Sequence, residues 1–140
     1  MKKVAVVFWS GTGNTETMAD GVVKGAQAAG ASVSKIAASG FSASGVDSYD
    51  AIAFGCPAMG SEQLEDSEFE PMFDSVKGSL SGKTIALFGS YGWGDGEWMR
   101  NWEDDCKAAG AILACDSVTA NEAPDDEAME ACRALGAALA

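Results

Sequence analysis

Histidine is absent from this 140-residue sequence, and lysine and arginine together number only 9, against 21 aspartate and glutamate residues. The resulting formal net charge of −12 at pH 7 argues against a nucleic-acid partner, because a polyanion is bound through a basic surface. The same charge disfavours anionic membranes and favours positively charged partner proteins. The absence of histidine also removes the commonest general base and metal ligand, so we expect no metal site.

Hydrophobic runs long enough to span a bilayer are also missing, and no signal-like segment precedes the first strand-like segment. Cysteine occurs at Cys56, Cys106, Cys115 and Cys132, with no C-x-x-C pair. Buried free thiols in a reducing cytosol are the favoured interpretation, and a metal site or a redox pair is the minor one. We therefore expect a cytoplasmic protein with no membrane attachment.

Strand-like and helix-like segments alternate along the whole chain, and 47% of the residues are hydrophobic, which is enough for one domain over residues 1–140. The patterns predict strands at 3–9, 32–38, 50–56, 82–90 and 111–118, helices at 14–29, 67–80, 96–110 and 125–140, and a loop at 39–49. Five continuous apolar strands alternating with helices predict a doubly wound α/β domain, with a parallel sheet covered on both faces.

Three turns rich in glycine and polar residues follow predicted strands, at 10–15, 57–62 and 90–96. The carboxyl ends of parallel strands lie at one edge of a sheet, which is where such folds bind ligands. We therefore expect these three turns to form one site.

The first turn, "SGTGNTET", joins a strand to a helix, as phosphate-binding turns do, but it contains no lysine or arginine. It lacks the lysine and spacing of a Walker P-loop, and Glu16 stands where a dinucleotide fingerprint has its third glycine. What remains are hydroxyl, amide and backbone N–H donors at the positive end of a helix, which suit one unreactive phosphate. An ordinary helix cap by Thr12 or Asn14 is the alternative.

Taken together, "WSGTGNT", "GCPAMGSEQLEDSEFEP" and "FGSYGWGDGEWMR" resemble the short-chain, clostridial-type flavodoxins over the whole chain. The resemblance implies a five-stranded parallel sheet in the order 2-1-3-4-5 and non-covalently bound FMN. It also implies a low-potential one-electron carrier that shuttles between semiquinone and hydroquinone for redox partner proteins. The cofactor-binding residues would be Ser10, Gly11, Thr12, Gly13, Asn14, Thr15, Pro57, Ala58, Met59, Gly60, Ser61, Glu62, Ser90, Tyr91, Gly92, Trp93 and Gly94.

The resemblance also suggests a role for several of these residues. The turn at 10–15 would hold the FMN phosphate with neutral donors, although Pro57 stands where some relatives have a phosphate-binding serine. Trp93 would stack on the outer face of the flavin ring, and Met59 would cover its inner face. The Gly92 N–H would meet the pyrimidine edge, and Glu62 would accept from flavin N3–H.

Three further expectations concern aromatic residues and the redox chemistry. Gly60 and Trp93 would tune the redox potentials, Gly60 through a peptide that turns its carbonyl toward flavin N5–H. For Tyr91 two roles are left open on equal terms: contact with the edge of the flavin ring, or packing behind the residues that contact the ring. We interpret Trp98 and Trp102, spaced i and i+4, as helix packing, and Trp9 as packing too.

Two other functions remain open at this point. An FMN-dependent oxidoreductase resembling a quinone reductase would need a second substrate pocket, and the chain has no insertion that would build one. A binding module that has lost its flavin is the third hypothesis. For the favoured carrier, we expect a monomer whose partners dock on the acidic face around the flavin.

Overall fold

The computed structural model describes residues 1–59, 62–92 and 94–140. In chain order the elements are β1 (Lys3–Phe8), α1 (Asn14–Ala28), β2 (Ser32–Ala37), the 3-10 turn η1 (Ala38–Gly40), α2 (Ala43–Val46), β3 (Ala51–Gly55), α3 (Phe69–Lys77), β4 (Thr84–Tyr91), α4 (Glu97–Ala108), β5 (Ile112–Leu113), β6 (Val118–Asn121) and α5 (Asp126–Leu139). No helix of the described chain is long and apolar enough to cross a membrane.

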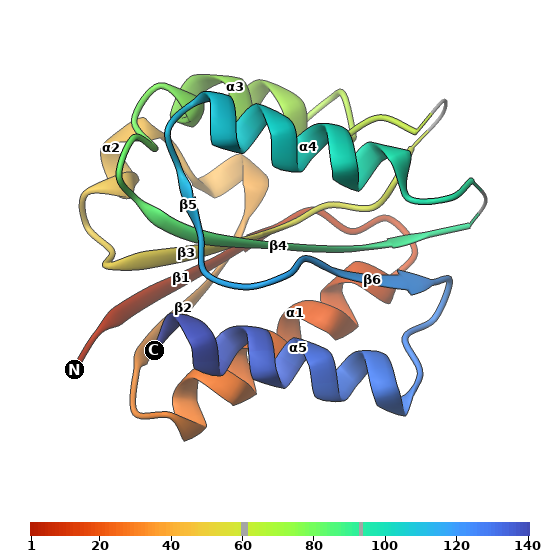
Figure 1. Cartoon of the computed structure of the whole chain (residues 1–140), viewed down its shortest axis with the longest axis horizontal. Helices are drawn as coiled ribbons and strands as arrows, with labels where there is room; N and C mark the ends of the chain where they lie inside the picture. Colours follow the sequence, from red (N-terminus) through yellow and green to blue (C-terminus); the bar gives the residue numbers. More distant parts are fainter. Residues whose placement is uncertain (60–61, 93) are drawn as a thin grey trace.

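The strands form one parallel sheet in the order β2-β1-β3-β4-β5, which confirms the predicted doubly wound fold. Helices α1 and α5 cover one face, and α3 and α4 cover the other (Figure 1). All five residues of β3 are buried, as the continuous apolar pattern of a strand covered on both faces requires.

The fifth strand differs from the prediction of one strand at 111–118. It is divided into β5 and β6, which both pair with β4. Ile85 and Phe88 are three residues apart in β4, but their partners Leu113 and Val118 are five apart, so two extra residues bulge out of the ladder. The bulge lets β6 continue to Asn121, beyond the predicted end of the strand.

Two other boundaries also differ from the prediction. The predicted loop at 39–49 contains η1 and α2, whose short length leaves little periodicity to detect. The helix predicted at 67–80 spans only Phe69–Lys77. At its start, the backbone N–H groups of Ser67 and Glu68 donate to the side-chain carboxylate of Glu65, so these two residues precede the helix.

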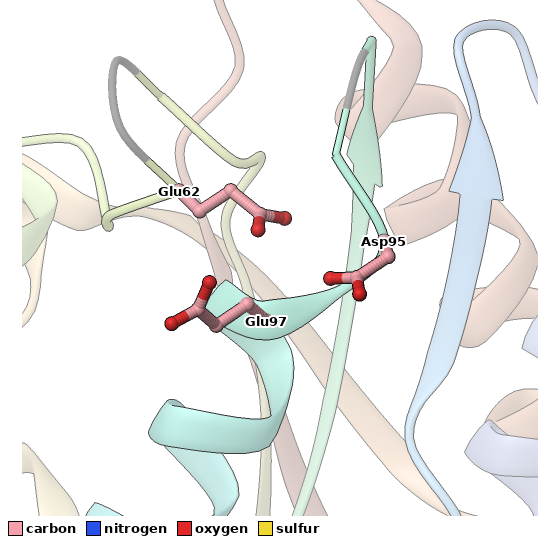
Figure 2. A group of neighbouring side chains, drawn as sticks. All are labelled: Glu62, Asp95 and Glu97. Atoms are coloured by element: carbon pink, nitrogen blue, oxygen red, sulfur yellow. The ribbon is translucent and has the colours of Figure 1, made fainter.

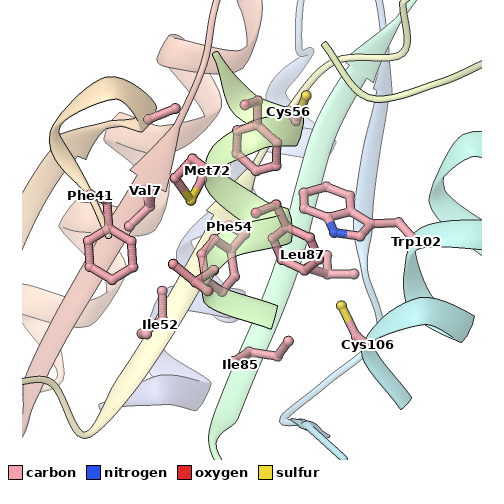
Figure 3. Close-up of a cluster of buried hydrophobic side chains, with 14 of the residues drawn as sticks. Val7, Phe41, Ile52, Phe54, Cys56, Met72, Ile85, Leu87, Trp102 and Cys106 are labelled. Atoms are coloured by element: carbon pink, nitrogen blue, oxygen red, sulfur yellow. The ribbon is translucent and has the colours of Figure 1, made fainter. Parts of the chain in front are cut away.

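The larger hydrophobic core lies between the sheet and α3 and α4 (Figure 3). Trp98 and Trp102 are each 2% exposed, which confirms their interpretation as packing residues. The Trp102 ring meets Phe69 and Phe73 edge to face, with centroids 5.4 and 5.7 Å apart. These contacts fix α4 to α3 and so position the turns that precede both helices.

On the opposite face, α1 and α5 approach each other closely at two glycines. A Cβ atom on Gly25 would lie 1.9 Å from the carbonyl oxygen of Arg133, and one on Gly136 would lie 2.0 Å from that of Val22. Any side chain at either position would force the helices apart. This contact fixes the axis of α1, whose first residues carry the candidate phosphate turn.

The four cysteines are free, as predicted. Cys56, Cys106 and Cys132 are buried, whereas Cys115 is half-buried. Burial raises the pKa of Cys106 to about 12 and that of Cys132 to about 11. The buried thiols are therefore protonated at neutral pH and unreactive.

Candidate functional site

The three turns predicted to meet do line one cavity of about 300 Å³, at the carboxyl edge of the sheet. The lining residues are Trp9, Gly11, Thr12 and Asn14 after β1, Pro57, Ala58 and Met59 after β3, Ser90, Tyr91 and Gly92 at the end of β4, and Glu122 after β6. The sequence-predicted residues Gly60, Ser61 and Trp93 lie outside the described residues. Ser10, Gly13, Thr15, Glu62 and Gly94 are described but do not line the cavity.

Glu122 is the lining residue that sequence reasoning missed. The predicted fifth strand ended at residue 118, so nothing placed residue 122 at the carboxyl edge. In the structure the backbone N–H of Glu122 donates to the Tyr91 carbonyl at 2.7 Å, and Glu122 has φ 57°. Recognising the bulge between β5 and β6 would have revealed this fourth loop.

The first turn is shaped by the hydroxyl of Ser10. Its Oγ accepts from the backbone N–H of Gly13 at 3.1 Å and from that of Glu16 at 3.2 Å. Gly13 is the N-cap of α1 with φ 96°, a conformation that glycine adopts without steric cost. Ser10 therefore caps two N–H groups at the start of α1, and the Thr12 hydroxyl accepts weakly from a third, that of Asn14, at 3.5 Å. Thr12 and Asn14 themselves line the cavity.

Thr15 takes a different position from the one that a direct ligand contact would suggest. It is 1% exposed, and its Oγ1 lies 3.1 Å from Ser90 Oγ in a buried hydroxyl pair. The Ser90 N–H also approaches Thr15 Oγ1, at 3.4 Å. The pair joins the start of α1 to the end of β4, and so holds the first and third turns at a fixed separation.

Trp9 combines the predicted packing role with a second one. Its ring packs against the larger core and also lines the cavity. A Cβ atom on Gly11 would lie 2.9 Å from the indole ring. The glycine therefore allows the phosphate turn to lie directly against Trp9, which forms part of the cavity wall.

The second turn is closed at its base by two hydrogen bonds between Met59 and Gln63, at 2.8 and 2.9 Å. Met59 lines the cavity and is 40% exposed, unusually open for a large apolar side chain. An apolar side chain in this position provides a surface for a flat ring.

Glu62 lies at the junction between the second and third turns. Its φ is 54°, uncommon for a residue with a side chain, and its Oε1 accepts from the Gly96 N–H at 3.2 Å. Carboxylate oxygens of Glu62, Asp95 and Glu97 lie within 4.8 Å of one another (Figure 2). This group makes the rim of the site strongly negative, relieved in part by Arg100, which pairs with Asp95 at 3.0 Å.

Glu65 anchors the segment between the second turn and α3. It is only 4% exposed, and its carboxylate accepts from the backbone N–H groups of Ser67, Glu68 and Phe69 at 2.8 Å each, and from the Ser67 hydroxyl. Burial acts to raise the pKa of Glu65, but these hydrogen bonds outweigh it and hold the pKa below its usual value.

The cavity fits FMN in its chemistry. One end presents hydroxyl, amide and helix N-terminal donors without a cationic side chain, which suits a phosphate that does not react. The other end is lined by the apolar and aromatic groups of Ala58, Met59 and Tyr91, as a flat ring system requires.

Comparisons with known proteins agree with this fold. The sequence model of the family described as flavodoxin matches residues 6–136. The flavodoxin of Megasphaera elsdenii is 46% identical over 137 residues, 98% of each chain. That of Clostridium beijerinckii is 42% identical over 135 residues, 96% of this chain and 97% of the relative.

Among solved structures, the solution structure of two-electron reduced Megasphaera elsdenii flavodoxin matches with a TM-score of 0.90. The match covers 97% of both chains at 46% sequence identity. Identity at this level over nearly the full length extends the likeness beyond the shared fold. The chain belongs to the flavodoxin family, whose members are electron carriers that bind FMN.

Proposed function

We propose that this chain is a low-potential one-electron carrier that holds FMN between the turns at 10–15, 57–62 and 90–94. The observation that carries the proposal is the single cavity in which these turns meet, with neutral donors at one end and apolar side chains at the other. FMN, when bound, supplies the one-electron chemistry. Thr12 and Asn14 would bind its phosphate, and Met59 and Tyr91 would contact its ring.

The acidic rim supports two parts of the proposal, the low redox potential of the bound FMN and the preference for basic partner proteins. The carboxylates of Glu62, Asp95 and Glu97 stand beside the two turns proposed to hold the ring. Their field opposes the addition of negative charge to the site, and so lowers the potential. The same field attracts basic redox partner proteins, at rates that fall as salt rises.

The proposal includes a monomer that works in the cytoplasm and is not itself an enzyme. Free cysteines suit a reducing compartment. To test the non-enzymatic role, the purified FMN-loaded protein is mixed with NADH or NADPH and a quinone. We expect no steady-state nicotinamide oxidation above the rate with free FMN. Turnover by the protein alone would favour the alternative, an FMN-dependent oxidoreductase.

Trp93→Ala is expected to weaken FMN binding at least about tenfold, because stacking on an aromatic face buries area and adds about 0.5–1.5 kcal/mol. The flavin fluorescence of the remaining complex should rise, since a stacked indole quenches it. Fluorescence titration of the apoprotein measures both effects. The buried Trp102→Phe is the control that keeps the turn intact, and an unchanged fluorescence yield in Trp93→Ala would refute the stacking assignment.

Gly60→Ala is expected to lower the first one-electron potential by about 20–65 mV, the equivalent of one net hydrogen bond. We propose that the carbonyl oxygen of the Gly60–Ser61 peptide would accept a hydrogen bond from the N–H at flavin N5, in a conformation that a Cβ disfavours. The two backbone hydrogen bonds between Met59 and Gln63, which close the ends of this turn, should stay intact. A spectroscopic redox titration measures the shift, with Gly78→Ala as an exposed control. Unchanged potentials in Gly60→Ala would exclude this role.

A further inference from the structure

The edge of the sheet at β6 presents backbone groups that no other strand of the described chain uses. Among the strands of residues 1–59, 62–92 and 94–140, β6 pairs with β4 alone, at the outer side of the sheet (Figure 1). The Glu122 N–H donates to Tyr91, and backbone groups alternate between the two sides of a strand. The N–H and C=O groups of Thr119 and Asn121 therefore point away from β4.

A cavity of about 700 Å³, larger than the candidate FMN cavity, lies along this free edge. We call it the edge groove, which is formed by residues 115–121, by Ala123 and Asp125, and by Glu127, Ala128, Ala131, Ala134 and Leu135 of α5. The small side chains on α5 leave the space open, and the bulge between β5 and β6 forms its end. The groove thus combines an unpaired strand edge with room beside it for a second strand.

The charged side chains that line the edge groove are all acidic. Asp116, Asp125 and Glu127 line it, and all three are exposed. No lysine or arginine is among the residues described as lining it. A segment that binds here therefore gains from carrying basic side chains.

The opposite edge of the sheet shows how a strand edge is protected in this molecule. There β2 carries Lys35 near its centre, which pairs with Glu16 at 3.0 Å and Asp20 at 2.8 Å. A charged side chain of this kind discourages the addition of another strand. The residues of β6, Val118–Asn121, include neither a charge nor a proline. The β6 edge thus lacks the protection of the β2 edge.

We propose that the edge groove binds an extended, lysine- or arginine-bearing segment of a redox partner protein, which adds as a strand to the free edge of β6. Main-chain hydrogen bonds to Thr119 and Asn121 would give affinity, and the three carboxylates would select basic side chains. That the occupant is a redox partner rests on the proposed function. Asn121 lines the groove and Glu122 lines the candidate FMN cavity, so a segment bound here would hold its protein beside the flavin.

The first test uses a short blocked peptide that alternates lysine with valine, added to the FMN-loaded, isotope-labelled protein. We expect NMR shifts at the amides of Thr119 and Asn121, and slower hydrogen exchange of the same two amides. The fully N-methylated peptide cannot form a backbone ladder and should produce neither effect. Binding of both peptides with equal affinity, or shifts confined to other surfaces, would overturn the proposal.

Matched variants separate the backbone contribution from the charge contribution. Thr119→Pro removes an N–H that β4 does not use and should weaken peptide binding about tenfold relative to Thr119→Ala. Asp116→Asn with Glu127→Gln should weaken it severalfold and flatten its salt dependence, whereas the exposed pair Asp47→Asn and Asp104→Asn should not. Equal affinities for the proline and alanine variants, both folded, would refute strand addition.

Two further measurements show whether a negative result contradicts the peptide-binding proposal or the proposed function. Sedimentation of the protein alone tests whether β6 instead pairs with a second copy of the chain, and a dimer abolished by Thr119→Pro would overturn the proposal. FMN affinity should be the same in Thr119→Pro and Thr119→Ala. A protein that binds no FMN contradicts the proposed function, whereas a protein that binds FMN but shows no peptide effect at β6 contradicts only this inference.

Discussion

Riboflavin is expected to bind the apoprotein at least about a hundredfold more weakly than FMN, because it lacks the phosphate that the turn at 10–15 would hold. Each hydrogen bond to a charged group contributes about 1.5–3 kcal/mol, so even two such bonds exceed a hundredfold in affinity. Thr12 and Asn14 line the cavity directly, so their side chains would supply these two bonds. Fluorescence titration with both flavins measures the difference.

Thr12→Ala tests the contribution of one side chain. It should weaken FMN binding about tenfold and leave riboflavin binding nearly unchanged, since the lost donor would face only the phosphate. Thr17→Ala is a matched control for the loss of a hydroxyl at the start of α1, because the exposed Thr17 donates to the Gly13 carbonyl at 2.9 Å and does not line the cavity. If riboflavin and FMN bound equally well, the assignment of this turn to phosphate would be wrong.

Thr15 and Ser90 show what the sequence can and cannot predict at this site. The pattern of strand, glycine-rich turn and helix placed both residues near the ligand, and both lie at the carboxyl edge of the sheet. Their direct contact joins positions 75 residues apart, and no local pattern specifies it. The alternative interpretation of the first turn made Thr12 or Asn14 the cap of α1. The Thr12 hydroxyl does accept from the Asn14 N–H, at 3.5 Å, but the Ser10 hydroxyl accepts from two N–H groups, those of Gly13 and Glu16.

The fold was predictable where a segment has one strong periodicity. Continuous apolar runs identified β1, β3 and β4, which are buried by both layers of helices. The order of the strands came from the family resemblance, because alternation alone leaves several topologies. The two-residue bulge between β5 and β6 has no local signature, and this is why Glu122 was missed. The edge groove depends on the same bulge.

Glu65→Gln is expected to destabilise the protein by about 2–4 kcal/mol at neutral pH, because one of its three backbone hydrogen bonds is lost and the other two are no longer made to a charged group. The amide oxygen could still accept from the N–H groups of Glu68 and Phe69, but the NH₂ group would face the Ser67 N–H, which now donates to the second carboxylate oxygen. FMN affinity should fall as well, since Glu65 fixes the segment that follows the turn at 57–62 to the start of α3. Urea unfolding and FMN titration measure the two effects.

Glu68→Gln is the control for the change of charge. Glu68 is exposed three residues along the chain, its backbone N–H donates to Glu65, and its side chain makes no described hydrogen bond, so its replacement should cost less than about 0.5 kcal/mol. A similar small effect in Glu65→Gln would mean that the buried carboxylate does not anchor the loop.

The pH dependence gives an independent measure of the same carboxylate. Its hydrogen bonds hold the pKa of Glu65 in the folded protein below the value of about 4.3 that is usual for an unfolded chain. The contribution to stability is therefore complete above about pH 4.3 and is lost as pH falls through the folded pKa. The wild-type protein should then lose stability more steeply than Glu65→Gln in acid, so that the gap between them narrows. If the difference in unfolding free energy between the wild-type protein and Glu65→Gln were the same at every pH, Glu65 would have the same pKa in the folded and unfolded states. Its hydrogen bonds would then not favour the charged form.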